Sequence, residues 1–268
     1  MLRRAPTNQR QRGFTLTELM ITVALGLSVI SSVLLGYLAT YKGSMGTLAS
    51  SKLGQDMNTV ISLMTGELRR AGYSAEAAVL DSPENNSFSV VDSTALEIFN
   101  TVASNTQQAA TGSGSCIVYT YDMDQDGVVD ATELSGFRLS NGVVQMRTSG
   151  NAADPDTCSS TSNTWSDLTD DDLLTVTALT FDLSGSNCLN TREPDGVNND
   201  ADGSTDESDE ADCYARVPTA GSNDITVETR EVAITLTGNL TNDSFTRLSI
   251  SQTVRVRNDW VRVRCKNG

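Results

Sequence analysis

The first part of the chain shows one long helical pattern in two halves. Apolar residues dominate from Leu16 to about Tyr41, which is enough to cross about 30 Å of hydrocarbon. Beyond them, apolar residues recur every three or four positions and form one stripe: Leu53, Met57, Val60, Met64, Leu68 and Ala71. The pattern predicts a helix from Phe14 to about Tyr73, membrane-spanning over 14–41 and amphipathic over 42–73. We expect the stripe to pack on this chain's own sheet rather than on a partner helix.

Within the remaining residues, 74–268, several segments alternate between apolar and polar positions in the manner of strands. Strand-like segments lie at 95–99, 116–121, 136–139, 143–147, 174–183, 225–240 and 245–257. Asn141-Gly142 predicts a tight hairpin, and Thr241 to Ser244 predicts a second antiparallel turn. The stretches 74–86, 101–115, 150–172 and 184–223 are expected to be polar loops. Together these elements predict an α+β fold, with a long N-terminal helix packed on an antiparallel sheet of one β-rich globular domain.

The charges before the apolar run indicate its orientation. Four arginines and no acid precede it, at Arg3, Arg4, Arg10 and Arg12. The positive-inside rule then leaves the N-terminus in the cytoplasm and sends the domain across the membrane. An ordinary secretory signal or a plain anchor is the alternative, but this apolar run is too long for the core of a secretory signal.

The composition excludes several classes of function. The formal charge of −15, from 19 basic and 34 acidic residues, does not suit the binding of nucleic-acid phosphates and favours divalent cations. The absence of histidine excludes histidine general bases, Ser-His-Asp triads and histidine-ligated zinc or haem. A pair of carboxylates can catalyse glycoside hydrolysis when an apolar pocket raises the pKa of one of them. The sequence implies no such pocket around its acidic residues, so we expect no enzymatic activity.

Five cysteines lie far apart without a Cys-x-x-Cys pair: Cys116, Cys158, Cys188, Cys213 and Cys265. Outside the cytoplasm they can oxidise. Their order suggests the disulfides Cys116–Cys158 and Cys188–Cys213, with Cys265 left over. Other connectivities remain open, because an odd count always leaves one thiol.

One acidic segment has the spacing of the twelve-residue EF-hand loop. Its oxygen-bearing positions are Asp122, Asp124, Asp126, Asp130 and Glu133, with the backbone carbonyl of Val128. Gly127 occupies the position of the sharp turn. The pattern predicts a Ca²⁺ site, and a solvated acidic turn is the alternative. Because strands are expected on both sides, the ion would stiffen the loop rather than open a pair of helices.

A second acidic segment repeats this spacing less closely. Its candidate ligands are Asn198, Asp200, Asp202, Ser204, Asp206 and Asp209, with Gly203 at the turn. The final side chain is shorter than Glu, so binding would be weaker or shifted in register. Asp195, Glu210 and Asp212 are alternative ligands. A charged disordered loop is the other interpretation, although a disulfide between Cys188 and Cys213 would close the segment.

The junction between the basic leader and the apolar run carries a resemblance to a known family. Gly13, Phe14 and, at the fifth position after the glycine, Glu18 stand in the sequence RGFTLTELM. This resembles the prepilin leader of type IV pilins, and it implies the type IV pilin fold. A prepilin peptidase would remove residues 1–13 between Gly13 and Phe14, and Phe14 would be N-methylated. Glu18 would pair with the free amine of a neighbouring subunit's first residue.

The end of the predicted helix resembles one particular family within the type IV pilins. The sequence ELRRAGY, Glu67 to Tyr73, resembles the PilW family of minor pilins. That family implies priming of pilus assembly with other minor and major pilins on an inner-membrane platform. The protein would lie in the inner membrane before assembly and at or near the pilus tip afterwards, where a large adhesin could join it.

Three other assignments share parts of this pattern. A minor pseudopilin of a type II secretion system would have the same leader and glutamate. A calcium-dependent adhesive tip module would use the acidic loops directly. A major pilin is less favoured, because two inserted acidic loops would crowd a filament wall. Motility, adhesion and DNA uptake are not distinguished.

Overall fold

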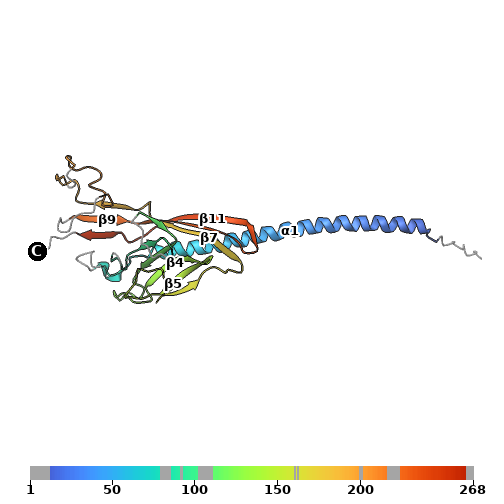
Figure 1. Ribbon diagram of the computed structural model, residues 1–268, viewed down its shortest axis with the longest axis horizontal. Helices are drawn as coiled ribbons and strands as arrows, with labels where there is room; N and C mark the ends of the chain where they lie inside the picture. Colours follow the sequence, from blue (N-terminus) through green and yellow to red (C-terminus); the bar gives the residue numbers. More distant parts are fainter. Residues whose placement is uncertain are drawn as a thin grey trace, which may run out of the picture. The chain divides into compact units, whose positions relative to one another are not determined.

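The computed structural model describes residues 13–78, 86–90, 93–101, 111–159, 161, 163–198, 202–215 and 224–263. The chain divides into two compact units between Ser51 and Lys52, and each unit is described by itself. Helix α1, Leu16–Leu68, contributes its first part to one unit and its last part to the other (Figure 1). Its apolar side chains in the first unit are exposed, from Leu16 at 75% to Leu48 at 65%.

In the second unit, α1 packs through the predicted stripe. The stripe residues are all buried: Leu53, Met57, Val60, Met64, Leu68 and Ala71. The helix ends at Leu68, five residues before the expected end, because the following backbone turns toward the sheet. Gly72 has a φ of 73°, and its amide donates to the carbonyl of Thr120 at 2.8 Å instead of to the helix. Only glycine adopts this left-handed conformation readily.

The strands form three antiparallel sheets, where the sequence pattern predicted one. The five-stranded sheet has the order β1 (Glu97–Phe99), β3 (Cys116–Thr120), β4 (Leu134–Ser140), β5 (Val143–Ser149), β6 (Thr164–Asp167). The four-stranded sheet has the order β11 (Asp243–Arg255), β10 (Glu231–Leu240), β7 (Leu174–Asp182), β2 (Ser113–Gly114). The three-stranded sheet has the order β12 (Trp260–Val263), β9 (Ile225–Thr229), β8 (Asn187–Asn190). A short 3₁₀ helix, η1 (Ala75–Ala78), follows α1.

Both predicted hairpins are present. Between β4 and β5, which lie side by side in Figure 1, Asn141 and Gly142 have φ values of 51° and 82°. Positive φ at both central residues is the requirement of the type I′ turn that Asn-Gly favours. Between β10 and β11 the turn is shorter than expected, because β11 already begins at Asp243.

The run 225–240, predicted as one strand, is divided into β9 and β10 at Arg230. The segment that pairs with this run is also divided, into β11 and β12, at the same level. There the amide of Val256 donates to the Arg230 carbonyl at 3.0 Å. The Arg230 side chain holds this bend: it pairs with Glu228 at 2.7 Å and lies 4.4 Å from the Trp260 ring centroid. One hairpin therefore contributes strands to two sheets.

Short strands occur in three regions expected to be loops. Strand β2 lies within 101–115, β6 within 150–172 and β8 within 184–223. Each lies at the edge of its sheet, where β2 pairs with β7, β6 with β5 and β8 with β9. These segments are short and rich in polar residues, so only the neighbouring strand reveals them.

Two disulfides fasten these regions. Cys116 on β3 is bonded to Cys158, and Cys188 on β8 is bonded to Cys213. The first pair is completely buried with Phe99 and Val118. These are the two pairings that the order of the cysteines suggested, and Cys265 lies outside the described residues.

A buried arginine holds the loop beside the first disulfide. Arg147 on β5 is 1% exposed and donates to the carbonyls of Leu134, Ser135, Pro155 and Thr157 at 2.7–3.2 Å. Desolvation by burial lowers the pKa of Arg147 to about 10. The side chain therefore links β4 to the loop before Cys158.

Candidate functional site

The first candidate site is the start of α1. Glu18 and Thr15 form a capping box: the Glu18 amide donates to Thr15 Oγ1 at 3.3 Å, and the Thr15 amide donates to Glu18 Oε2 at 3.5 Å. The Thr15 hydroxyl also donates to Glu18 Oε2 at 3.3 Å. Such a box satisfies helix amides that have no partner inside the helix. Gly13 and Phe14 immediately precede it, and both are exposed.

The helix that follows fits an inner-membrane anchor. Within the described residues, α1 is the one helix long and apolar enough to cross a membrane, and its most apolar window is 0% buried. Glu18 lies in the first turn, where the partial positive charge of the helix end favours a carboxylate. The arginines of the leader lie outside the described residues.

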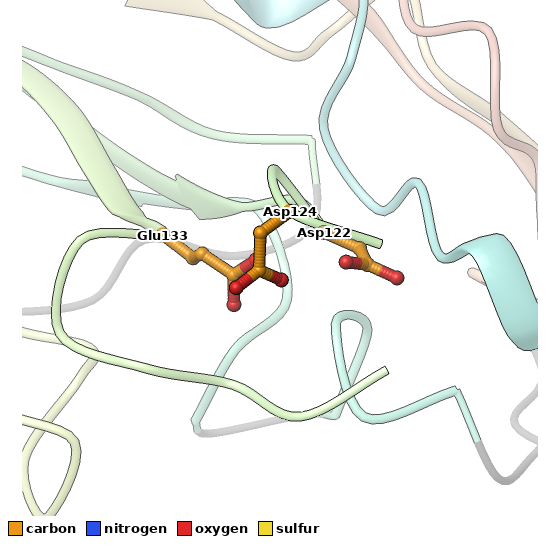
Figure 2. A group of neighbouring side chains, drawn as sticks. All are labelled: Asp122, Asp124 and Glu133. Carbon is orange, nitrogen blue, oxygen red and sulfur yellow. The ribbon is translucent and has the colours of Figure 1, made fainter. Parts of the chain in front are cut away.

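The second candidate site is the first acidic loop, between β3 and β4. Carboxylate oxygens of Asp122, Asp124 and Glu133 lie within 4.8 Å of one another, and Figure 2 shows the three side chains together. Asp122 and Glu133 are 2% and 1% exposed, whereas Asp124 is exposed. The loop thus brings its first, third and twelfth positions together. Carboxylates gathered in this way are hard oxygen ligands of the kind that Ca²⁺ prefers.

Hydrogen bonds fix the two buried acids. Glu133 accepts from the amide of Met123 at 2.6 Å and from that of Asp130 at 3.1 Å, so it closes the loop. One oxygen of Asp122 accepts from the Ala75 amide at 2.9 Å. The other, Oδ1, is buried and has no hydrogen-bond partner among the described residues. A buried carboxylate oxygen without a partner is costly unless a cation meets it.

The pKa values of two acids in the loop are shifted in opposite directions. Desolvation by burial raises the pKa of Glu133, and the charges of Asp130 and Asp122 add to this against the two amide hydrogen bonds. In contrast, hydrogen bonds from the side chain and backbone of Thr132 lower the pKa of Asp130. Local hydrogen bonds therefore stabilise the ionised form of Asp130, whereas burial disfavours the ionised form of Glu133.

The other predicted ligands of this loop face different partners. Asp126 accepts from the Val128 amide at 2.8 Å, and Asp130 accepts from the Thr132 amide at 2.7 Å. Neither belongs to the gathered group of three carboxylates. Gly127 makes the predicted sharp turn, with a φ of 75°.

One acid beside this loop was missed by the sequence analysis. A Cβ placed on Gly127 would lie 2.8 Å from Cδ of Glu76, so the Glu76 carboxylate lies against the turn. Glu76 belongs to η1, in a segment expected to be a polar loop. Its position depends on the path of the chain after α1, and no spacing in the sequence indicates it.

The second acidic loop gathers a different set from the predicted one. Asp206 lies with Asp195 and Glu193, and their carboxylate oxygens are within 4.8 Å of one another. Asp195 was an alternative ligand, and Glu193 was missed. The group does not include Asp202 or Asp209.

Local hydrogen bonds explain this register. The Gly196 amide donates to Asp206 at 2.8 Å, which holds the segment that carries Glu193 and Asp195 beside Asp206. Asp202 instead accepts from the Ser204 amide at 2.9 Å. Asp200 lies outside the described residues, and the roles predicted for Asn198, Ser204 and Asp209 stay predictions.

Two matches with known families cover most of the chain. Residues 8–34 match the prokaryotic N-terminal methylation motif, a range that contains Gly13, Phe14 and Glu18. Residues 46–256 match the family described as prepilin peptidase-dependent protein B. Neither match is specific to PilW minor pilins. No curated protein and no solved structure matches the chain significantly. With its methylation motif, apolar helix and antiparallel sheets, this type IV pilin-like chain belongs to the prepilin peptidase-dependent protein B family.

Proposed function

We propose that this protein is a minor pilin of the PilW type that primes type IV pilus assembly and ends at or near the pilus tip. The observation that carries the proposal is the junction of Gly13 and Phe14 with an exposed apolar helix whose first turn holds Glu18. The family match supports a minor pilin or pseudopilin. The ELRRAGY end of the helix favours the pilus over the secretion system.

In this proposal, the prepilin peptidase cuts between Gly13 and Phe14, and Phe14 becomes the N-methylated first residue. Glu18 then pairs with the first-residue amine of a neighbouring pilin. The Thr15–Glu18 contacts are 3.3–3.5 Å long, and their donors, backbone amides and a hydroxyl, carry no charge. A cationic amine forms a stronger bond to a carboxylate and neutralises it in hydrocarbon. Assembly would therefore replace the weaker contacts with a stronger one.

The remaining partners follow from the same proposal. Before assembly the chain is anchored in the inner membrane, with its N-terminus in the cytoplasm. An assembly platform then joins it to other minor and major pilins. The domain then reaches the pilus tip and can support a large adhesin. The exposed apolar surface of α1 in the first unit supports this order of events, because such a surface needs lipid or other helices around it.

The deciding experiment compares a strain that lacks this gene with its parent. Sheared surface pili and secreted exoproteins are measured in both strains. Loss of pili with normal secretion supports the priming minor pilin. Normal pili with lost secretion would contradict it and assign the protein to the pseudopilins of a type II secretion system.

We further propose that the first acidic loop binds Ca²⁺ through Asp122, Asp124 and Glu133, and that the second offers a weaker site at Glu193, Asp195 and Asp206. The buried Asp122 oxygen without a hydrogen-bond partner supports the first site. Calcium at about 100 times its dissociation constant would stabilise the fold by roughly 2.7 kcal/mol. If the tip domain itself adheres through these loops, adhesion depends on calcium while piliation does not.

This site is tested by thermal unfolding of the full chain in detergent, in EDTA and in Ca²⁺. We expect calcium to raise the melting temperature of the parent. Glu133→Gln should lose most of that shift, whereas Glu231→Gln, an acid on β10, should keep it. Equal shifts in both variants would contradict the site.

A further inference from the structure

A cavity of about 360 Å³ lies at the end of α1 in the second unit. Three arginines and two tyrosines line it: Arg69, Arg70, Arg257, Tyr73 and Tyr121. The arginines come from two segments, the turn after α1 and the bend after β11. Their convergence is notable in a chain with 34 acidic and 19 basic residues.

The backbone fixes the two segments against each other. The Arg257 amide donates to the Arg69 carbonyl at 3.2 Å. The Asn258 side chain donates to the carbonyls of Ala71 at 3.0 Å and Arg70 at 3.4 Å. These bonds join positions 187 or 188 residues apart, so the fold itself brings the two sides of the cavity together.

Two of these arginines have no counter-ion among the described residues. Arg69 and Arg257 are exposed and form no ion pair with any residue that the structure describes. Arg255, by comparison, pairs with Asp259 at 3.2 Å. Like charges brought to one cavity repel each other, and an anion between them would relieve that repulsion.

The tyrosines give this cavity a partly apolar wall. The Arg70 guanidinium lies 4.6 Å from the ring centroid of Tyr121, and the same arginine pairs with Glu67. The Tyr121 hydroxyl donates to Glu67 at 3.4 Å, which orients the ring. Stacking on an aromatic ring holds a guanidinium in place, so less freedom is lost when it binds a ligand. Arg70 is therefore pre-positioned in the cavity that Arg69 and Arg257 also line.

We propose that this cavity binds an oxyanion, carried as a carboxylate or as a phosphate group by its ligand. The planar fork of arginine matches both groups, and two or three such forks make a charge-assisted site. The volume lies within the range of small-ligand pockets. Asp122 also lines the cavity and opposes an anion, so the expected affinity for a free anion is weak.

The proposal is tested by titrating the full chain, in detergent and EDTA, with inorganic phosphate and separately with glutarate, at constant ionic strength. Arginine Nε resonances report the site. We expect saturable shifts at Arg69 and Arg257, and none at Arg247, an exposed arginine on β11. EDTA keeps this test independent of the calcium sites.

Variants give the matched control. Arg69→Gln with Arg257→Gln should weaken anion binding at least tenfold, and Arg247→Gln should leave it unchanged. These side chains are exposed, so the melting temperature should stay near that of the parent. A stronger response to glutarate assigns a carboxylate source and a stronger response to phosphate assigns a phosphate source. Shifts that stay linear for both anions, or that are equal at Arg247, would overturn the proposal.

Discussion

Thr15 and Glu18 close a reciprocal capping box at the start of α1, with three contacts of 3.3–3.5 Å between them. The glutamate that the pilin resemblance assigns to subunit pairing is thus also the residue that caps its own helix. The cap needs only a hydrogen-bond acceptor, whereas pairing with an amine needs a charge. Substitutions can therefore separate the two roles.

Glu18→Ala removes both roles, and Thr15→Ala removes the cap but keeps the carboxylate. We expect both variants to be processed and inserted. Glu18→Ala should be recovered poorly in sheared filaments, because the amine of the neighbour has no partner. Thr15→Ala should lose about 1 kcal/mol of helix stability and still assemble. Immunoblots of sheared and membrane fractions measure both, and normal recovery of Glu18→Ala would contradict the pairing.

Gly13→Leu tests the proposed cleavage site. A bulkier residue before the scissile bond should exclude the chain from the peptidase, so residues 1–13 should remain attached. Intact-mass measurement distinguishes the two forms directly. Gly26→Leu, a substitution inside the apolar helix at a position with open space around it, is the control and should be processed normally. Mature protein from Gly13→Leu would rule out this site.

Gly127→Val tests the turn of the first acidic loop. At a φ of 75° a side chain strains the backbone by about 1–2 kcal/mol, and the nearby Glu76 must move. We expect calcium to stabilise this variant less than the parent. Gly66→Val, on α1 with open space at its Cβ, is the control for β-branching. An undiminished calcium shift in calorimetry would show that this turn does not shape the site.

Arg147→Met tests the buried arginine beside the first disulfide. Four carbonyls lose their donor in this variant, so we expect a loss of about 3 kcal/mol or more from the free energy of unfolding. Arg247→Met, at an exposed position, should change it by less than about 0.5 kcal/mol. Chemical denaturation measures both variants. Equal losses would mean that the buried hydrogen bonds contribute nothing specific.

The family assignment and the outline of the fold follow from local sequence. The leader and the apolar run are recognised from consecutive residues. The stripe from Leu53 to Ala71 recurs every three or four positions, which matches the period of a helix. Asn141-Gly142 defines its hairpin because positive φ is a property of those two residues. Strand alternation likewise located most of the long strands.

Tertiary structure decided what depends on contacts between distant segments. Arg230 divides a run that was predicted as one strand, and Asp206 meets Glu193 and Asp195 through a backbone bond that no spacing encodes. Arg69 and Arg257 share a cavity only because the turn after α1 meets the bend after β11. Periodicity reports which face of an element is buried, but the partner of that face is set by packing across the whole domain.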